Sequence, residues 1–146
     1  MERLALTFFD FYQYLLLPII LIIGWIVCIL VGAKQKKELL TVSVIYFWHT
    51  LFSCYYWYYT LTNTADAVGY YIGSHTEEFS LNPGTAFLTT FTSLFTKVFE
   101  ANYLNTALVF NIFGSIGLIL FYKTLRHYFK SLGRVPNLKN TEKALF

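Results

Sequence analysis

Few residues of this sequence carry a charge. Only 13% are Asp, Glu, Lys or Arg, whereas a soluble domain has about 25%. Hydrophobic residues make up 56% of the 146 residues, and aromatic residues make up 21%. A soluble fold of this size has too much surface for its volume to hide so many apolar side chains. The composition excludes a soluble enzyme and a disordered chain, and it predicts an integral membrane protein.

Cysteine is also scarce. The two cysteines, Cys28 and Cys54, form no CxxC pair and match no metal-binding spacing, which excludes a disulfide-rich secreted scaffold. On antiparallel helices that rise about 1.5 Å per residue, the two positions would differ in depth by roughly 10 Å, too far for a disulfide bond. We interpret both as small apolar packing residues, and we expect no bound metal ion or cofactor.

Long runs without charge are what the sequence has instead. Three of them exceed the roughly 20 residues that an α-helix needs to cross a bilayer. Because every backbone amide in lipid must be paired internally, these runs predict helices rather than open strands. We therefore expect one all-α membrane domain over residues 1–146, with three transmembrane helices near 14–32, 40–61 and 103–122.

A fourth uncharged run is different, because it opens with the turn signal Asn82-Pro83-Gly84. From there apolar residues recur at spacings of three and four, which predicts an amphipathic helix over 84–100 that lies in the membrane interface. The apolar stripe consists of Phe87, Leu88, Phe91, Leu94, Phe95, Val98 and Phe99. The polar face consists of Thr85, Thr89, Thr92, Ser93, Thr96, Lys97 and Glu100.

Positive charges are unevenly distributed along the chain. Three lysines lie within 34–37 and six Lys or Arg within 123–146, whereas the long 62–102 connection contains one lysine. Because cytoplasmic segments are enriched in Lys and Arg, we place 34–37 and the basic tail 123–146 in the cytoplasm. The N-terminus and the extracytoplasmic 62–102 loop are then outside. The tail is expected to contact anionic lipid headgroups, and the net charge of +3 is no sign of a nucleic-acid partner.

Aromatic residues end the second predicted span: Tyr55, Tyr56, Trp57, Tyr58 and Tyr59. Tyr and Trp concentrate where one end of the side chain must be apolar and the other end wet. We interpret the run as a belt at the outer membrane interface. The alternative is an aromatic platform for a lipid or a sugar ring.

His49 lies near the middle of the same span. An ionisable side chain at this depth is a functional hypothesis by default. Haem or a metal ion would usually need a second ligand at similar depth, and His75 and His127 lie elsewhere in the sequence. We interpret His49 as a neutral, hydrogen-bonded packing residue. Contact with a quinone or another cofactor is the alternative.

The last predicted span carries small and polar residues on one side. Ala107, Asn111 and Ser115 are four residues apart and share a helix face, with Gly114 and Gly117 nearby. Small residues permit close helix contacts, and Asn can form hydrogen bonds between helices. We expect a packing face, either against the other spans or against another chain.

The outer loop contains Asp66, His75, Glu77 and Glu78, residue types that bind divalent cations or transfer protons. Their spacing matches no tight metal motif, so a solvated acidic loop is the simpler interpretation. Asp66 differs from the other three because it follows the second span closely and would lie beside the membrane face.

Three features around Asp66 resemble a known family. An aromatic-rich span leads into ADAVGYY at 65–71, an amphipathic helix opens with Pro83-Gly84-Thr85, and the return span contains FNIFGSIG at 110–117. This order resembles the N-terminal part of large bacterial membrane proteins of the GT-C glycosyltransferase or polysaccharide-polymerase type, which place an Asp in the first extracytoplasmic loop next to interfacial helices. The resemblance covers about residues 40–125. It implies that Asp66 faces a lipid-linked sugar donor, as a base or as the partner of a divalent cation.

Two functional hypotheses follow. The leading one is a small accessory subunit without catalytic activity, with the bilayer and the other subunits of a larger membrane complex as its partners. The alternative is a truncated or split N-terminal module of a GT-C-like transferase that uses Asp66, and we do not expect this module to catalyse transfer alone. The expected location is a bacterial inner membrane or the inner membrane of an organelle.

Overall fold

The computed structural model describes residues 10–63, 65–76, 79–80 and 82–132, and every regular element in that part of the chain is helical. This confirms the predicted all-α class. The α-helices are α2 (Phe11–Gly32), α3 (Lys36–Thr60), α4 (Asp66–Thr76), α5 (Thr85–Ser93) and α6 (Tyr103–Leu132). A short π-helix, η1 (Leu94–Val98), continues α5.

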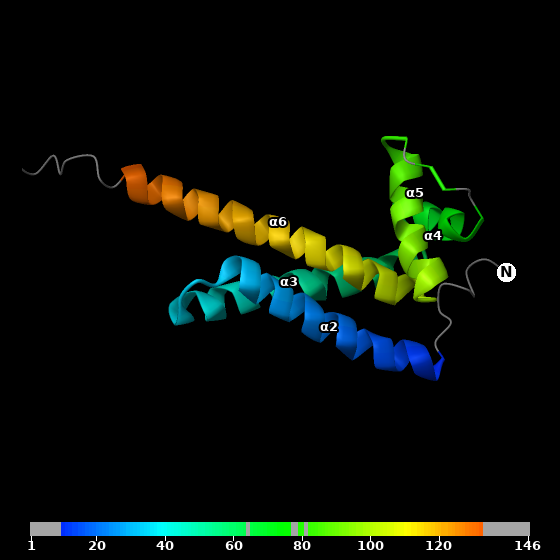
Figure 1. The fold of residues 1–146 in the computed structure, drawn as a ribbon, viewed down its shortest axis with the longest axis horizontal. Helices are drawn as coiled ribbons and strands as arrows, with labels where there is room; N and C mark the ends of the chain where they lie inside the picture. The colour runs from blue at the N-terminus through cyan, green and yellow to red at the C-terminus, as the bar shows by residue number, and fades with distance from the viewer. Residues whose placement is uncertain (1–9, 64, 77–78, 81, 133–146) are drawn as a thin grey trace, which may run out of the picture.

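Three long helices form the body of the molecule (Figure 1). The helices α2, α3 and α6 run roughly along its long axis, and α4 and α5 gather at one end of this bundle. The N-terminal end of α2 lies at the same end as α4 and α5, and the turn between α2 and α3 lies toward the opposite end. The helix α5 stands across the direction of α6.

Two glycines let α2 approach its neighbours closely. Gly24, Cys28 and Gly32 recur every four residues and are buried on one face of α2. A Cβ atom at Gly24 would lie 2.7 Å from the Tyr46 hydroxyl oxygen, and one at Gly32 would lie 2.7 Å from a methyl carbon of Val42. Both distances are shorter than van der Waals contact, so the packing depends on the missing side chains. The sequence analysis predicted a small-residue face on the last span and missed this one.

Hydrogen bonds connect α2 and α3 beside these glycines. The Tyr46 hydroxyl donates to the Leu21 carbonyl oxygen at 2.9 Å, and Trp25 Nε1 donates to Ser43 Oγ at 2.9 Å. A polar group that is buried without a partner costs free energy, so each bond favours the one alignment in which it forms. The two bonds fix the register of α2 against α3.

Polar side chains are buried in the bundle while many large apolar side chains are exposed. The buried polar residues include Gln13, Thr50, Asn105, Asn111 and Ser115. Exposed apolar side chains occur on all three long helices, for example Leu30 at 77%, Leu40 at 72% and Phe121 at 62%. Soluble bundles bury most of their large apolar side chains and expose their amides, which is the opposite distribution.

Within the described part of the chain, two helices are long and apolar enough to cross a membrane: Phe11–Gly32 and Tyr103–Ser131. They correspond to the first and the last of the three spans predicted from the sequence. The middle helix, α3, has 25 residues and is long enough to cross. Its many Tyr, Trp, Ser and Thr residues make it less apolar than the other two helices. A third span at α3 therefore stays a prediction.

Helices α5 and η1 occupy most of the segment 84–100, and four of its five threonines are buried while Thr85 is exposed. The buried side chains are Thr89, Thr90, Thr92 and Thr96. Ser74 of α4 and Thr96 share a hydrogen bond, with 3.0 Å between their hydroxyl oxygens. The exposed side chains include Phe87, Leu88, Leu94, Val98 and Phe99. The polar side of this helix contacts the rest of the chain, and so does Phe91 of its apolar side, which packs against Phe110 and Phe113 of α6.

The helix α4 was not predicted from the sequence, which indicated only a loop between the second span and residue 84. Gly69 and Gly73 each lower the helix propensity of this short stretch by about 1 kcal/mol relative to alanine. Burial of Tyr71 and Ser74 and the contact of Ser74 with η1 compensate for that cost. The helix is therefore stabilised by tertiary packing, which local sequence does not reveal.

The helix α6 extends beyond its predicted end at residue 122 and continues to Leu132. The sequence contains no Gly or Pro between Gly117 and Gly133 that would stop it. Lys123, Arg126 and Lys130, which begin the predicted basic tail over 123–146, consequently lie on this helix. The remainder of that segment, 133–146, lies outside the described residues.

Basic residues at this end of the bundle are tied to α2 and α3. Lys123 Nζ donates to the Val31 carbonyl oxygen at 3.2 Å, and Arg126 forms an ion pair with Glu38 at 2.8 Å. The backbone N–H of Lys34 also donates to Glu38 at 3.0 Å. This N–H, together with the Arg126 guanidinium, lowers the pKa of the Glu38 carboxyl below its usual value.

Candidate functional site

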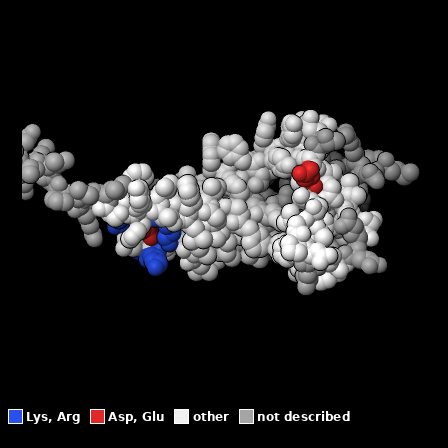
Figure 2. Space-filling model, turned by 90° about the horizontal axis from the view of Figure 1, so that it is seen from above, with Lys and Arg blue, Asp and Glu red and all other residues white. Residues whose placement is uncertain are grey.

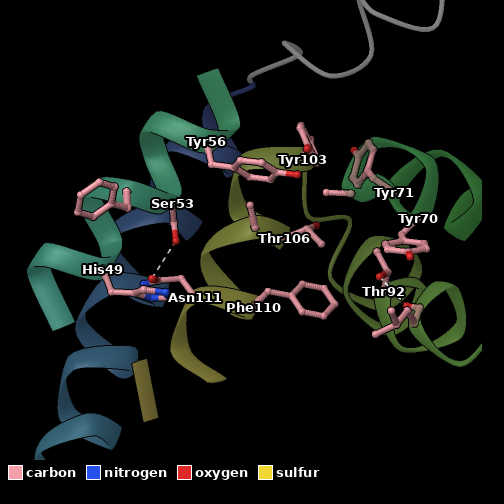
Figure 3. Close-up of a pocket in the computed structure, with 14 residues that line it drawn as sticks. His49, Ser53, Tyr56, Tyr70, Tyr71, Thr92, Tyr103, Thr106, Phe110 and Asn111 are labelled. Atoms are coloured by element: carbon pink, nitrogen blue, oxygen red, sulfur yellow. Dashed lines mark hydrogen bonds between the residues drawn. The ribbon is translucent and has the colours of Figure 1, made fainter. Parts of the chain in front are cut away.

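A cavity of about 490 Å³ opens between α3 and α6 on one side and α4 and α5 on the other (Figure 3). Its volume is in the range of small-molecule sites. It is lined by His49, Phe52, Ser53, Tyr56, Ala67, Tyr70, Tyr71, Leu88, Thr92, Tyr103, Thr106, Ala107, Phe110 and Asn111. None of these side chains belongs to Asp, Glu, Lys or Arg.

Asn111 of α6 is the centre of the polar contacts at this cavity. Its Nδ2 donates to Thr50 Oγ1 at 2.8 Å, and its Oδ1 accepts from Ser53 Oγ at 3.0 Å. The Thr50 hydroxyl in turn donates to the Tyr46 carbonyl oxygen at 2.9 Å. Asn111 is only 2% exposed, so both ends of its amide are used to join α6 to α3.

His49 of α3 lies beside this network. Its Nδ1 is 3.1 Å from Ser115 Oγ. Its ring also lies over Gly114, where a Cβ atom would be only 2.5 Å from the imidazole Cε1. Two residues of α6 therefore fix the orientation of the ring, while Nε2 makes no hydrogen bond to a described residue. The placement fits a hydrogen-bonded packing residue, and it also brings an imidazole to the wall of the cavity.

Aromatic rings form much of the remaining wall. Tyr71 of α4 and Tyr103 of α6 are in contact, with 5.2 Å between ring centroids, and burial raises the pKa of the Tyr71 phenol. The Tyr103 hydroxyl shares a hydrogen bond of 2.9 Å with Thr60 Oγ1. Phe110 contacts Phe91 of α5, with 5.6 Å between ring centroids. These contacts bring α4 and α5 against the bundle and leave the cavity between them.

Asp66 is exposed as the first residue of α4 and does not line the cavity, although its neighbour Ala67 does. His75 lies near the other end of α4, so the structure does not bring these two residues together. Glu77 and Glu78 lie outside the described residues. Among the residues that are described, no three His, Cys, Asp or Glu side chains gather as a metal site requires.

His75 packs edge-on against Tyr71, with 5.0 Å between ring centroids. Partial burial lowers the pKa of its imidazole, and the nearby charge of Lys97 lowers it further. The neutral form is therefore favoured at this position. Tyr71 lines the cavity, whereas His75 does not.

The aromatic run at the end of α3 divides between two environments. Tyr55, Tyr56, Tyr58 and Tyr59 are exposed, and among these four Tyr56 also lines the cavity. Trp57 points the other way and packs against the buried side chains of α2, α4 and α6. The run is therefore partly an outer surface and partly a contact between helices.

The small residues predicted on the last span face different surroundings. Ala107 and Asn111 line the cavity, and Ser115 is buried against His49. Gly117 faces open space, with no atom within 4 Å of a Cβ placed there. The face formed by Ala107, Asn111 and Ser115 thus packs against α3 of the same chain, while Gly117 lies on the outer surface. The two cysteines are both free, with Cys28 buried and Cys54 exposed.

A polar cluster that the sequence analysis did not single out joins α2 to the beginning of α6. Gln13 Nε2 donates to the Glu100 carbonyl oxygen at 2.6 Å. Gln13 Oε1 accepts from the Asn102 backbone N–H at 2.9 Å and from Asn105 Nδ2 at 2.8 Å. A signal was present in the sequence, because amide side chains next to apolar helices need buried partners.

Together these features define a helical protein with two helices apolar enough to cross a membrane and an uncharged cavity near one end of its bundle. No family model, curated protein or solved structure matches the chain. The likeness to GT-C enzymes therefore stays an expectation from the sequence, and the function is argued from the geometry.

Proposed function

We propose that this chain is an integral membrane protein of the bacterial inner membrane whose three long helices all cross the bilayer. We further propose that it acts as a non-catalytic accessory subunit of a larger membrane complex. One observation carries the membrane assignment: amides and hydroxyls are buried between α2, α3 and α6, and large apolar side chains cover their outer surfaces. Water penalises this distribution, whereas lipid favours it.

The contacts of α3 support a position inside the bilayer. Side chains of α3 form hydrogen bonds with α2 and with α6, as described for Tyr46 and Ser53. Its outward face exposes Phe47, Trp48 and Leu51 by half or more of their surface. The part of α3 that lies beside α2 and α6 and has this outer face is better suited to lipid than to water.

The distribution of charge supports an orientation. The Lys and Arg side chains visible in Figure 2 gather at one end of the molecule. The contacts of Lys123 and Arg126 with the ends of α2 and α3 place both residues at that end. By the positive-inside rule this end is cytoplasmic, so α4, α5 and the N-terminal end of α2 are outside.

The direction and the faces of α5 support an interfacial position for it. It stands across the long axis of the bundle (Figure 1), with Thr89, Thr90 and Thr92 buried and with Phe87, Leu88 and Leu94 exposed. A helix lying in the membrane plane would bury this apolar side about 5–10 Å into the boundary between headgroups and acyl chains.

The aromatic outer surface of α3 supports a protein partner. Trp48, Phe52 and Tyr55 are all exposed on this helix, and Tyr and Trp are enriched among the residues that dominate binding between proteins. An interfacial belt accounts for Tyr55, whereas Trp48 and Phe52 lie farther from the end of α3 and favour a contact with another membrane subunit.

The test is extraction in a mild detergent followed by native electrophoresis and mass spectrometry of the band that contains the chain. We expect migration with stoichiometric partner subunits. Trp48→Ala should release the partners, whereas the matched control Leu120→Ala, an exposed residue on α6, should retain them. Migration of the wild-type chain alone would contradict the subunit role.

The transferase module is a second candidate, and the position of Asp66 favours it. Its carboxylate is exposed at the beginning of α4, next to Ala67 at the cavity and at the same end of the bundle as α5. An acidic residue beside interfacial helices is what the resemblance to GT-C enzymes implies. Asp66→Asn would then abolish transfer from a lipid-linked sugar while leaving the amount of protein unchanged. Full activity of this variant would exclude the candidate.

A further inference from the structure

We infer that the cavity between α3, α4, α5 and α6 binds a neutral amphipathic molecule from the membrane, one whose flat ring carries a carbonyl or hydroxyl group. This inference goes beyond the proposed subunit role. It requires the cavity to be reached from the bilayer, but it requires no partner chain. Three properties of the cavity support this inference. Its lining contains no Asp, Glu, Lys or Arg, its walls are aromatic, and some of its polar groups form no hydrogen bond within the described part of the chain.

The lining excludes a charged headgroup. None of the lining residues is Asp, Glu, Lys or Arg, and the acidic residue nearest in sequence to the lining, Asp66, lies outside it. A phosphate or carboxylate in the cavity would lose its hydration without gaining an opposite charge, which is costly in an apolar site. The ligand is therefore neutral.

The walls favour a ring over a flexible chain. Six Phe and Tyr residues line the cavity: Phe52, Tyr56, Tyr70, Tyr71, Tyr103 and Phe110. They come from α3, α4 and α6, so aromatic faces and edges approach the cavity from several sides (Figure 3). Offset-stacked and edge-to-face contacts with such walls stabilise a planar ring beyond the area that it buries.

The polar groups of the cavity differ in whether they already form hydrogen bonds to other side chains. Ser53 and Asn111 are hydrogen-bonded to each other, and Asn111 is also bonded to Thr50. The imidazole of His49 uses Nδ1 toward Ser115, and Nε2 has no partner among the described residues. In either neutral tautomer Nε2 is then a free acceptor or a free donor. His49, like the phenol groups of Tyr56, Tyr70 and Tyr71 in the same lining, is consequently a group that can bond to a carbonyl or hydroxyl on the ring.

The experiment uses the full chain in lipid nanodiscs, with decylubiquinone as the probe and quenching of tryptophan fluorescence as the signal. Binding to the cavity is saturable, whereas partition of the probe into lipid adds a linear component. His49→Phe keeps a ring of similar size and removes the hydrogen bond. We expect it to weaken binding about fivefold, which corresponds to the loss of one ordinary hydrogen bond.

Two variants fill the cavity from opposite walls. Ala107→Leu on α6 and Ala67→Leu on α4 should each weaken binding about tenfold or more, because the added side chain occupies the space of the ring. Their matched controls are Gly117→Leu and Gly69→Leu, on the same two helices, where a Cβ atom meets nothing within 4 Å. Both controls should bind as the wild type does. Because the two filling variants lie on different helices, misfolding of one leaves the other as the test.

Two results would overturn the inference. One is the absence of a saturable component in the wild-type chain. The other is equal competition by decylbenzene together with unchanged binding in His49→Phe, which would mean that the cavity holds hydrocarbon chains. Neither result bears on the proposed subunit role, because that role is tested by native electrophoresis in the absence of decylubiquinone.

Discussion

The two halves of the helical bundle are held together by different interactions. In the half near the basic residues, Cys28, Val42, Tyr46 and Ile119 form a buried cluster. Gly24 and Gly32 bring α2 so close to this cluster that no side chain fits at either position. We call this the close-packed half. Its helices are joined by close side-chain packing at these glycines, together with the hydrogen bonds of Tyr46 and Trp25 between α2 and α3.

The half near α4 and α5 contains the cavity, and we call it the cavity half. Here α3 and α6 are joined by side-chain hydrogen bonds, chiefly those of Asn111 with Thr50 and Ser53 and that of His49 with Ser115. In lipid there is little hydrophobic force between helices, so close packing and hydrogen bonding are the two ways to associate them. Close packing leaves no space between α2 and its neighbours, whereas the cavity lies where α3 and α6 face α4 and α5.

Filling the close-packed half should have the largest effect on stability. Gly24→Leu would push α2 away from Tyr46 and Ile112, because a Cβ atom at residue 24 would lie 2.7 Å and 2.8 Å from their side chains. We expect the free energy of unfolding to fall by about 3 kcal/mol, at the upper end of the usual cost of overpacking. In a Cys54→Ser background, maleimide labelling of the buried Cys28 should become faster.

The matched control for this substitution is Gly117→Leu, which adds the same side chain where nothing lies within 4 Å. It should leave both the unfolding midpoint and the labelling rate of Cys28 unchanged. Equal behaviour of the two variants would mean that the close-packed half does not depend on its glycines.

Removing the central hydrogen bonds of the cavity half should cost less. Asn111→Leu approximately keeps the side-chain volume and deletes the hydrogen bonds to Thr50 and Ser53. We expect the free energy of unfolding to fall by about 1–2 kcal/mol, which is within the range for polar contacts between membrane helices. Thr50→Val deletes one of the same bonds. A double-mutant cycle in reversible unfolding should therefore give a total well below the sum of the two single effects. Strict additivity would contradict the coupling of these residues.

The sequence predicted the separate helices of both halves and several of their polar residues, but it did not predict how the helices pair. The uncharged runs predicted α2, α3 and α6, because the amino-acid composition of a single segment determines whether it is favourable in lipid. Asn111, Ser115 and His49 were also singled out, since polar residues within apolar helices need partners. Their pairing was not predictable, because it depends on the register between α3 and α6.

The cavity itself had no sequence signal. It forms because α4, which local propensity did not predict, packs against α5 and leaves Ala67, Tyr70 and Tyr71 opposite Asn111 and Phe110 of α6. The glycines of α2 were missed for a related reason. Gly24 and Gly32 matter through what they would touch in α3 and α6, and a single helix pattern does not contain that information.

The ion pair at the basic end should add a small, pH-dependent contribution to the close-packed half. The Lys34 N–H and Arg126 lower the pKa of Glu38 from its ordinary value of 4.5. Since the depressed pKa belongs to the folded state, the contribution is present above about pH 4.5 and is lost as the pH falls through the folded-state pKa. Unfolding midpoints measured from about pH 6 to about pH 3 should fall more for the wild type than for Glu38→Gln. Parallel curves would contradict the role of Glu38.

The smallest effect is expected at Glu100, where the chain turns from η1 into α6 at the cavity half. Glu100 has φ 48°, in the left-handed region that costs a residue with a side chain roughly 1–2 kcal/mol. Glu100→Gly relieves this strain, and the freer unfolded chain offsets part of the gain, so we expect a net stabilisation of about 0.5 kcal/mol. The hydrogen bond from Gln13 Nε2 to the carbonyl oxygen of residue 100 involves the backbone and is retained in this variant.

Glu100→Ala is the matched control, because it removes the carboxylate and keeps the strain. If both variants were stabilised equally in reversible unfolding, the gain would come from the lost charge and not from the backbone.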